Sequence, residues 1–194
     1  HTIDSLVLPV QLPSKFDLRN VELVSNGNFS VLSLDLRSTL LSELFPAVAI
    51  ASQARYENSK IDIDAFSLAI ADDSISGTAV LNWAGTTQLT GSYVVDIENI
   101  DSIIELPEQL DLSRLFSAGT FESSVLQEGV AGELVIQELT GQLGVYPLEG
   151  QGSIKLNDGA LEINQLQLIT QSNELLLNGI YADKLDFNWE VTAN

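Results

Sequence analysis

Residues that could do acid–base or nucleophilic chemistry are scarce in this chain. Its single histidine, the side chain most often used as a general base, is His1, where the role of a chain-end residue is expected. The sequence has no cysteine, which excludes thiolate nucleophiles, disulfides and thiolate metal sites. One histidine and no cysteine also leave no ligand set for transition metals that prefer sulfur or imidazole. We therefore assign no catalytic residue and no metal ligand.

Carboxylates are the remaining candidates for a site. Asp62 and Asp64 alternate with two isoleucines, which predicts a strand with both carboxylates on its solvent side. Asp72-Asp73 stands between two apolar runs, where aspartate favours a turn because its side chain can bond the turning backbone. A calcium loop of the type Asp-x-Asp-x-Asp-Gly does not surround this pair. Both carboxylate pairs are interpreted as structural.

Two short motifs also favour a structural interpretation. Gly141, Gly144, Gly150 and Gly152 are closely spaced, but they form neither a GxGxxG nor a Walker pattern, so strand ends or bulges are expected in place of a phosphate cradle. Asn28-Phe29-Ser30 matches the glycosylation triplet, which is short enough to occur by chance. No cofactor is expected.

Composition limits the partners of the chain. The 194 residues include 8 Lys and Arg against 27 Asp and Glu, which gives a net charge of −19. This charge repels a nucleic-acid backbone and an anionic headgroup surface, so any contact with lipid must run through acyl chains. The longest uncharged stretch, 44–54, is too short to span a bilayer. Because the chain begins with histidine, we expect it to be a fragment of a longer protein.

Most segments alternate apolar and polar residues with the period of a half-buried strand. Leu89–Ile97 and Leu185–Val191 are clear examples. Asn, Gly and Asp cluster between such runs, at 25–28, 84–86 and 157–159, where hairpin turns are expected. Trp83 and Trp189 lie on alternating segments, where buried anchors are expected. The pattern predicts a mainly antiparallel all-β chain.

In two segments the sequence is compatible with either a helix or a loop. Leu36–Phe45 carries apolar residues on one side of a possible helix and ends before Pro46. Asn99–Leu106 is closed in the same way by Pro107. Little helix is expected elsewhere.

A recurring phase slip is the most informative feature of the sequence. Two apolar residues alternate, the phase shifts by one residue, and further apolar residues alternate. The copies are Phe16, Leu18, Val21, Leu23; Ile61, Ile63, Phe66, Leu68; Leu110, Leu112, Leu115; Leu134, Ile136, Leu139; and Leu161, Ile163, Leu166, Leu168. This recurrence predicts one elongated β-domain, residues 1–194, with internal repeats over roughly 16–97 and 110–191.

An undistorted strand with such a slip would turn its second half toward the opposite face. A bulge at Asp64-Ala65, and likewise at Asn164-Gln165, keeps both halves on one side and bends the strand. Neighbouring strands that bend at the same level fold the sheet lengthwise into a trough. The alternative is a strand, a tight turn and a new strand of an ordinary β-sandwich.

The stretch Leu148–Leu168, continued by Asn173–Gly179 and Leu185–Trp189, closely resembles the TamB family of the AsmA-like, bridge-like lipid transfer group. Leu8–Pro13 followed by Phe16–Leu23 is similar to the segment that opens repeating units in that family. The resemblance covers most of the chain and is weakest over 98–130.

The resemblance implies a strongly curved, trough-like β-sheet with an apolar interior, within a periplasmic protein anchored in the inner membrane of a Gram-negative bacterium. It implies a segment of a bridge that carries phospholipids between the inner and outer membranes. It also implies outer-membrane assembly with the barrel protein TamA, and no enzymatic activity. On the order of a dozen strands would form a segment of roughly 60 Å, with open sheet edges at both ends.

The family pattern supplies no functional residues. The phase of the repeats therefore indicates which side chains should line the interior, and these are our candidates for contact with phospholipid acyl chains. These are Ile61, Ile63, Phe66, Leu68, Leu134, Ile136, Leu161, Ile163, Leu166, Leu168, Leu175, Leu177, Phe187 and Trp189. Two other hypotheses remain: a scaffold that binds outer-membrane proteins by β-strand augmentation, and a closed β-sandwich binding module.

Overall fold

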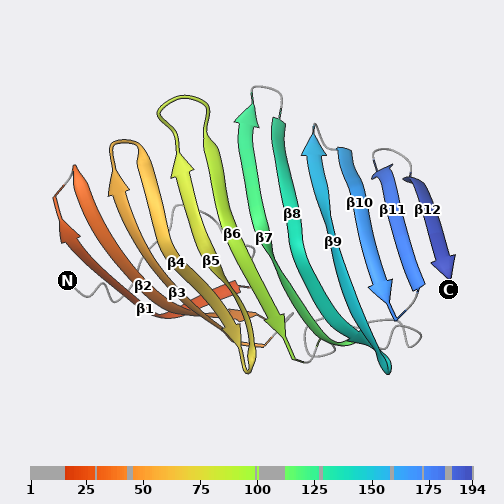
Figure 1. Ribbon diagram of the computed structural model, residues 1–194. Coiled ribbons are helices and arrows are strands. Elements are labelled where there is room, and N and C mark those ends of the chain that lie inside the picture. The colour runs from red at the N-terminus through yellow and green to blue at the C-terminus, as the bar shows by residue number, and fades with distance from the viewer. Residues whose placement is uncertain are drawn as a thin grey trace.

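The computed structural model describes residues 16–28, 30–42, 46–98, 100, 112–126, 129–157, 160–171, 173–181 and 185–193. These ranges form one sheet of twelve strands, in which the spatial order of the strands is the order in the chain (Figure 1). Every neighbouring pair is antiparallel. The architecture is therefore an open meander, which confirms the predicted all-β class.

The strands are β1 (Phe16–Gly27), β2 (Val31–Ser42), β3 (Val48–Glu57), β4 (Lys60–Ile70), β5 (Asp73–Asn82), β6 (Gln88–Ile97), β7 (Leu112–Leu126), β8 (Gly129–Leu143), β9 (Tyr146–Asn157), β10 (Ala160–Thr170), β11 (Asn173–Tyr181) and β12 (Leu185–Ala193).

The helix considered at Leu36–Phe45 does not form, because residues 36–42 belong to β2. Leu36 and Leu40 also fit a period of two, and β2 is hydrogen-bonded to strands on both sides, so sheet pairing overrides the helical spacing. Residues 43–45 lie outside the described ranges. The second helix candidate, Asn99–Leu106, lies outside them too, except for Ile100.

Bulges bend the strands at the predicted places. The register between β4 and β5 shifts between Ile63 and Phe66, and that between β10 and β11 shifts between Ile163 and Leu166. Both strands continue through the shift. The alternative, in which the phase slip marks a tight turn followed by a new strand, is therefore wrong for these two strands. The strands curve along their length and the whole sheet forms a trough (Figure 1).

One bulge is held by a side chain of the next strand. Gln165 adopts the left-handed conformation with a φ of 49°, and its backbone N–H donates to Oδ1 of Asn178 over 2.7 Å. The amide of Asn178 thereby satisfies a donor that the bulge removes from the β-ladder. Asn20, at the register shift of β1, has a comparable φ of 53°.

The register sorts the side chains onto two faces of different chemistry. One cross-strand row, here called the central row, passes through all twelve strands without a charged residue. It comprises Ser25, Leu34, Ala54, Ile63, Ala79, Gly91, Phe121, Leu134, Ile154, Ile163, Gly179 and Phe187. We call the face that contains this row the apolar face and the opposite one the polar face.

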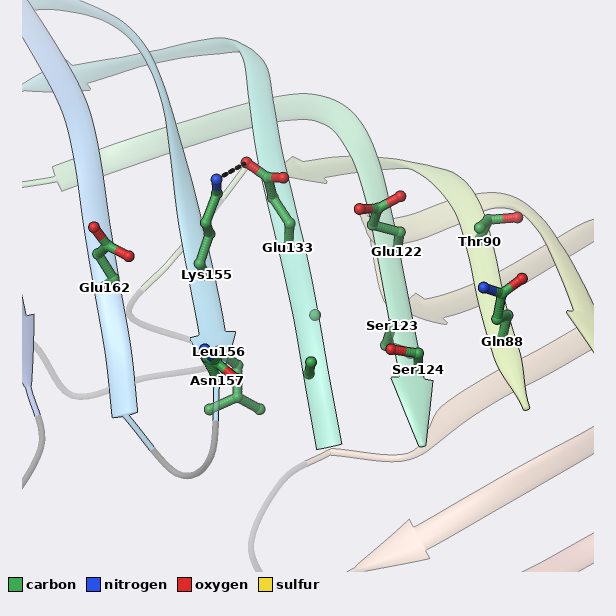
Figure 2. Close-up of a pocket in the computed structure, with 12 residues that line it drawn as sticks. Gln88, Thr90, Glu122, Ser123, Ser124, Glu133, Lys155, Leu156, Asn157 and Glu162 are labelled. Carbon is green, nitrogen blue, oxygen red and sulfur yellow. Dashed lines mark ion pairs between the residues drawn. The ribbon is translucent and has the colours of Figure 1, made fainter. Parts of the chain in front are cut away.

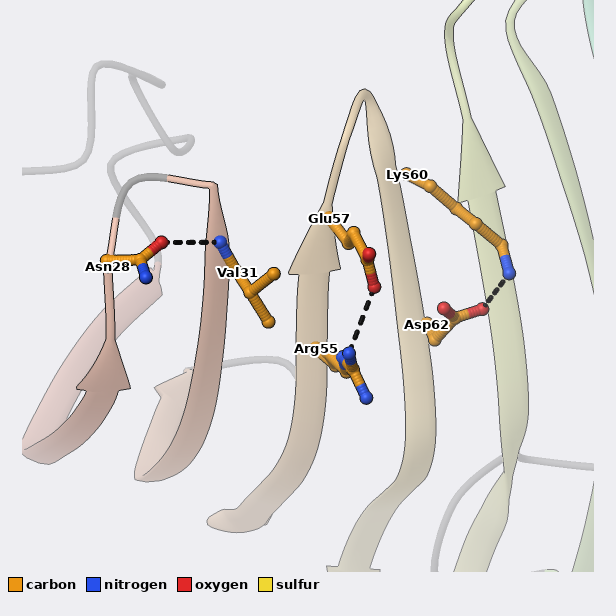
Figure 3. A network of polar contacts seen from close by, with 6 residues as sticks. All are labelled: Asn28, Val31, Arg55, Glu57, Lys60 and Asp62. Atoms are coloured by element: carbon orange, nitrogen blue, oxygen red, sulfur yellow. Dashed lines mark hydrogen bonds and ion pairs between the residues drawn. The ribbon is translucent and has the colours of Figure 1, made fainter.

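Ion pairs lie on the polar face. Arg55 Nη2 is 3.0 Å from Glu57 Oε2, and Lys60 Nζ is 2.6 Å from Asp62 Oδ1 (Figure 3). Their side chains are partly exposed, so each pair stabilises the fold by less than about 1 kcal/mol. Asp62 therefore lies on the solvent side of β4, as its alternation with isoleucine predicts.

Three aromatic rings lie over glycines of neighbouring strands on the apolar face. Phe66 covers Gly77, Phe121 covers Gly91 and Tyr93 covers Gly119. A Cβ added at Gly119 would lie 1.9 Å from the carbonyl oxygen of Val135 and 3.0 Å from the ring of Tyr93. Such crowding indicates that the apolar face lies on the inner side of the bend, where only glycine leaves room for the ring.

Asp73 begins β5, and the two residues before it make the turn. Its carboxylate is 6% exposed, and Oδ1 accepts a 2.6 Å hydrogen bond from the backbone N–H of Glu98. This hydrogen bond joins the start of β5 to the residue that follows β6.

We expect Gly119→Ala to lower the free energy of unfolding by roughly 2–4 kcal/mol, because the added methyl group displaces a backbone carbonyl and the Tyr93 ring. Gly85→Ala is the matched control, since nothing lies within 4 Å of an added Cβ there, and its effect should stay within about 0.5 kcal/mol. Urea unfolding measures both, and equal stabilities would contradict the crowding argument.

Asp73→Ala should cost roughly 1–3 kcal/mol, because it leaves the Glu98 N–H without its acceptor in a buried place. Asp72→Ala, at an exposed turn position, should change stability by less than about 0.5 kcal/mol. Thermal unfolding distinguishes the two variants. An Asp73→Ala protein as stable as the Asp72→Ala protein would refute this role of the carboxylate.

Candidate functional site

The apolar face is the candidate site, and the register brings the predicted interior residues together on it. Ile63, Leu134 and Ile163 lie in the central row, where Phe187 pairs with Gly179. The remaining predicted residues lie in the rows beside it: Ile61 and Leu161 on one side, and Phe66, Leu68, Ile136, Leu166, Leu168, Leu175, Leu177 and Trp189 on the other.

The prediction missed the contribution of several other strands to this face. Leu34, Leu36, Ile50, Phe121 and Ile154 share the face through their cross-strand partners. Their period-two alternation is visible in the sequence, but alternation alone does not tell which of two faces a strand presents. The pairing of each strand with a bulged neighbour supplies that information.

No second layer covers the apolar face within the described ranges. Each strand packs against the strands beside it in the sheet, and no large side chain there is fully buried. The closed sandwich considered from the sequence does not form, because a sandwich needs a second sheet packed on the first. The face therefore forms an open trough.

Burial varies along the trough. Ala79 and Ser117 in the central strands are 5% and 8% exposed, whereas Trp189 in the last strand is 71% exposed. Trp83, just beyond β5, is 38% exposed. Neither tryptophan is the buried anchor that was predicted, because Trp189 lies in the last strand of a single-layer sheet and Trp83 follows the end of its strand.

Some polar groups on the apolar face are paired, whereas the buried hydroxyl of Thr170, which the register also places there, has no hydrogen-bond partner among the described residues. The hydroxyl oxygens of Tyr93 and Ser117 lie 3.3 Å apart. Asp73, at the margin, is the one charged residue that the register places on this face among the described strands. Such a surface favours hydrocarbon, and it disfavours a charge because the charge would lose water without gaining a partner.

A hollow on the polar face has a different character. Its volume is about 440 Å³, and its lining includes Glu122, Glu133, Lys155 and Glu162 (Figure 2). These four residues are successive cross-strand partners on β7 to β10, and Lys155 Nζ lies 3.7 Å from Glu133 Oε1. The excess of carboxylates makes this hollow unsuitable for an acyl chain.

Two features are absent from the described residues, a cluster of metal ligands and a membrane-spanning helix. No group of three or more His, Cys, Asp or Glu side chains among them is placed to hold a metal ion. No helix in the same ranges has the length and hydropathy needed to cross a membrane.

Comparison with known families identifies the chain. The family model described as TamB, N-terminal domain, matches residues 2–194. Neither curated proteins nor solved structures gave a match. TamB proteins are periplasm-spanning, non-enzymatic components of the translocation and assembly module, which acts with TamA in outer-membrane biogenesis. Because the match extends over nearly all of the sequence, the chain belongs to the TamB N-terminal domain family.

Proposed function

We propose that this chain is a segment of a periplasmic bridge that carries phospholipids between the inner and outer membranes. The acyl chains travel along the apolar face, and the headgroups stay in water. The observation that carries the proposal is the central row, which crosses all twelve strands without a charge and has no covering layer in the described ranges.

The dimensions of the trough suit such a role. Twelve strands spaced about 4.8 Å apart give a row of roughly 53 Å from the first strand to the last. A bilayer has a hydrocarbon core about 30 Å thick, so one acyl chain covers about 15 Å. A phospholipid is therefore much shorter than the row and can move along it while its chains remain in contact with apolar side chains.

The energetics favour movement along the row over release into water. Each methylene group removed from water contributes about 0.8 kcal/mol, so an acyl chain that leaves the trough for solvent loses many kcal/mol. Movement from one strand to the next exchanges one apolar contact for another. Uncharged positions in the central row therefore matter more than the identity of any single side chain.

The polar face supports the same proposal. The net charge of −19 keeps this face hydrated and away from anionic membrane surfaces. In our proposal, anchoring in the inner membrane and association with TamA at the outer membrane hold the bridge in place, and the segment itself remains a passive conduit.

Ile136→Lys tests the proposal, because Ile136 lies between Gly119 and Gly152 in the middle of the trough. A charge there has no partner, so phospholipid bound to the purified chain should fall at least about tenfold. Gln137→Lys places the same charge on the adjacent, exposed residue and should leave binding unchanged. Native mass spectrometry counts the bound lipids. Equal lipid loading of the two variants, with both folded, would refute the proposal.

A second candidate function rests on the edges of the sheet. Within the described ranges, β1 and β12 each pair with one strand only, so their outer backbone groups are available for β-strand augmentation. The occupant would be an unfolded outer-membrane β-strand.

Photo-crosslinking separates the two candidates. A photoreactive residue at Asn188, on the exposed edge strand, should react with an unfolded outer-membrane barrel protein if the scaffold function holds. The same residue at Ile136 should react with phospholipid if the conduit function holds. Products with protein at Asn188 and none with lipid at Ile136 would favour the scaffold.

A further inference from the structure

The two halves of the sheet differ along one rim of the trough. This rim, here called the hairpin rim, consists of the strand ends that are joined in the hairpins β1–β2, β3–β4, β5–β6, β7–β8, β9–β10 and β11–β12, at the top of Figure 1. The apolar-face side chains nearest this rim decide whether the trough is open to solvent there.

From β2 to β6 these rim side chains are half-buried. They are Leu32, Tyr56, Ile61, Leu81 and Leu89. In the second half, four apolar-face side chains near the rim are exposed. Leu156 at 40% and Tyr181 at 52% lie in the row that contains Leu89, and Val125 at 54% and Val130 at 46% lie one row closer to the β7–β8 turn. Val125 pairs with Val130, and the half-buried Leu161 pairs with both Leu156 and Tyr181, so the exposed side chains extend from β7 to β11 with Leu161 between them.

An aromatic pair covers the rim in the first half. The rings of Tyr56 and Trp83 are stacked, with centroids 6.0 Å apart and an interplanar angle of 17°. The register places Tyr56 on the apolar face beside Ile61, and Trp83 reaches it from just beyond the end of β5. The tryptophan therefore extends across the end of β4 to meet a ring two strands away.

Backbone hydrogen bonds hold the segment that carries Trp83. The N–H of Trp83 donates to the carbonyl oxygen of Ser59 over 3.0 Å, which ties the β5–β6 connection to the β3–β4 hairpin. At the other end of the connection, the N–H of Val125 in β7 donates to the carbonyl oxygen of Thr87 over 2.9 Å. The covering ends at Val125, where the exposed apolar side chains begin.

We propose that the trough has a lateral opening along the hairpin rim from β7 to β11, through which phospholipid acyl chains enter or leave, and that the Tyr56–Trp83 pair closes the same rim over β3 to β5. This inference rests on the proposed conduit function. It adds that transfer into the groove is confined to one half of the segment, and that Trp83 and Tyr56 determine where the closed part ends.

The test uses a phospholipid with a photoreactive diazirine on its acyl chain, bound to the unmodified chain and irradiated. Mass spectrometry of the digested protein then locates the lipid adducts. Adducts should form along the central row and at the open rim, at Val130 and Tyr181. Fewer should form at Ile61, which lies on the same face under the closed part of the rim. Trp83→Ala should raise the yield at Ile61 by about threefold to tenfold, the range expected from the stacking energy of an aromatic pair. Thr86→Ala, in the same connection, is the control and should leave the pattern unchanged.

These outcomes distinguish a failure of the lateral opening from a failure of the conduit function. Two results would overturn the lateral opening: equal adduct yields at Ile61 and Val130 in the unmodified chain, or an unchanged yield at Ile61 in a folded Trp83→Ala protein. If adducts still form along the central row, the conduit function stands. Adducts absent from the whole apolar face overturn both.

Discussion

The structure depends on one constraint: side chains of a β-strand alternate between two faces, and a strand that bends must keep its apolar residues on the same face. A single extra residue solves this problem by shifting the phase at the bend. The shifts at Ile63/Phe66 and Ile163/Leu166 lie 100 residues apart and serve the same purpose in β4 and β10. Without them, the second half of each strand would place its leucines and phenylalanines among the carboxylates of the polar face.

The bent strands and their bulges could be predicted from the sequence, because the order of apolar and polar residues shows where the phase shifts. Ile61, Ile63, Phe66 and Leu68 mark both the strand and its bulge. The helix at Leu36–Phe45 was a wrong alternative, since spacing within a short segment does not reveal that strands pair on both sides of it. The tryptophans were misplaced because alternation implies a covered face, whereas this sheet has a single layer in its described part.

The roles of several glycines depend on contacts between strands. Gly77, Gly91 and Gly119 are ordinary strand residues in the sequence, and nothing near them predicts their role. In the structure each accommodates an aromatic ring from the next strand, and the partner is 11 to 30 residues away. The same is true of Asp73, whose hydrogen bond reaches residue 98. Contacts of this kind depend on the register between strands, which the pattern of one strand does not contain. The division into repeats 16–97 and 110–191 stays a prediction.

In the proposed function, the apolar face holds the acyl chains of phospholipids. Methyl-labelled NMR of the chain with bound phospholipid tests it most directly, through nuclear Overhauser effects between lipid methylene protons and the methyl groups of isoleucine, leucine and valine. Our account predicts such effects at Ile63, Leu134 and Ile163, which lie in the central row. Effects confined to Val94 and Ile180, on the polar face, or absent from every methyl group, would contradict it.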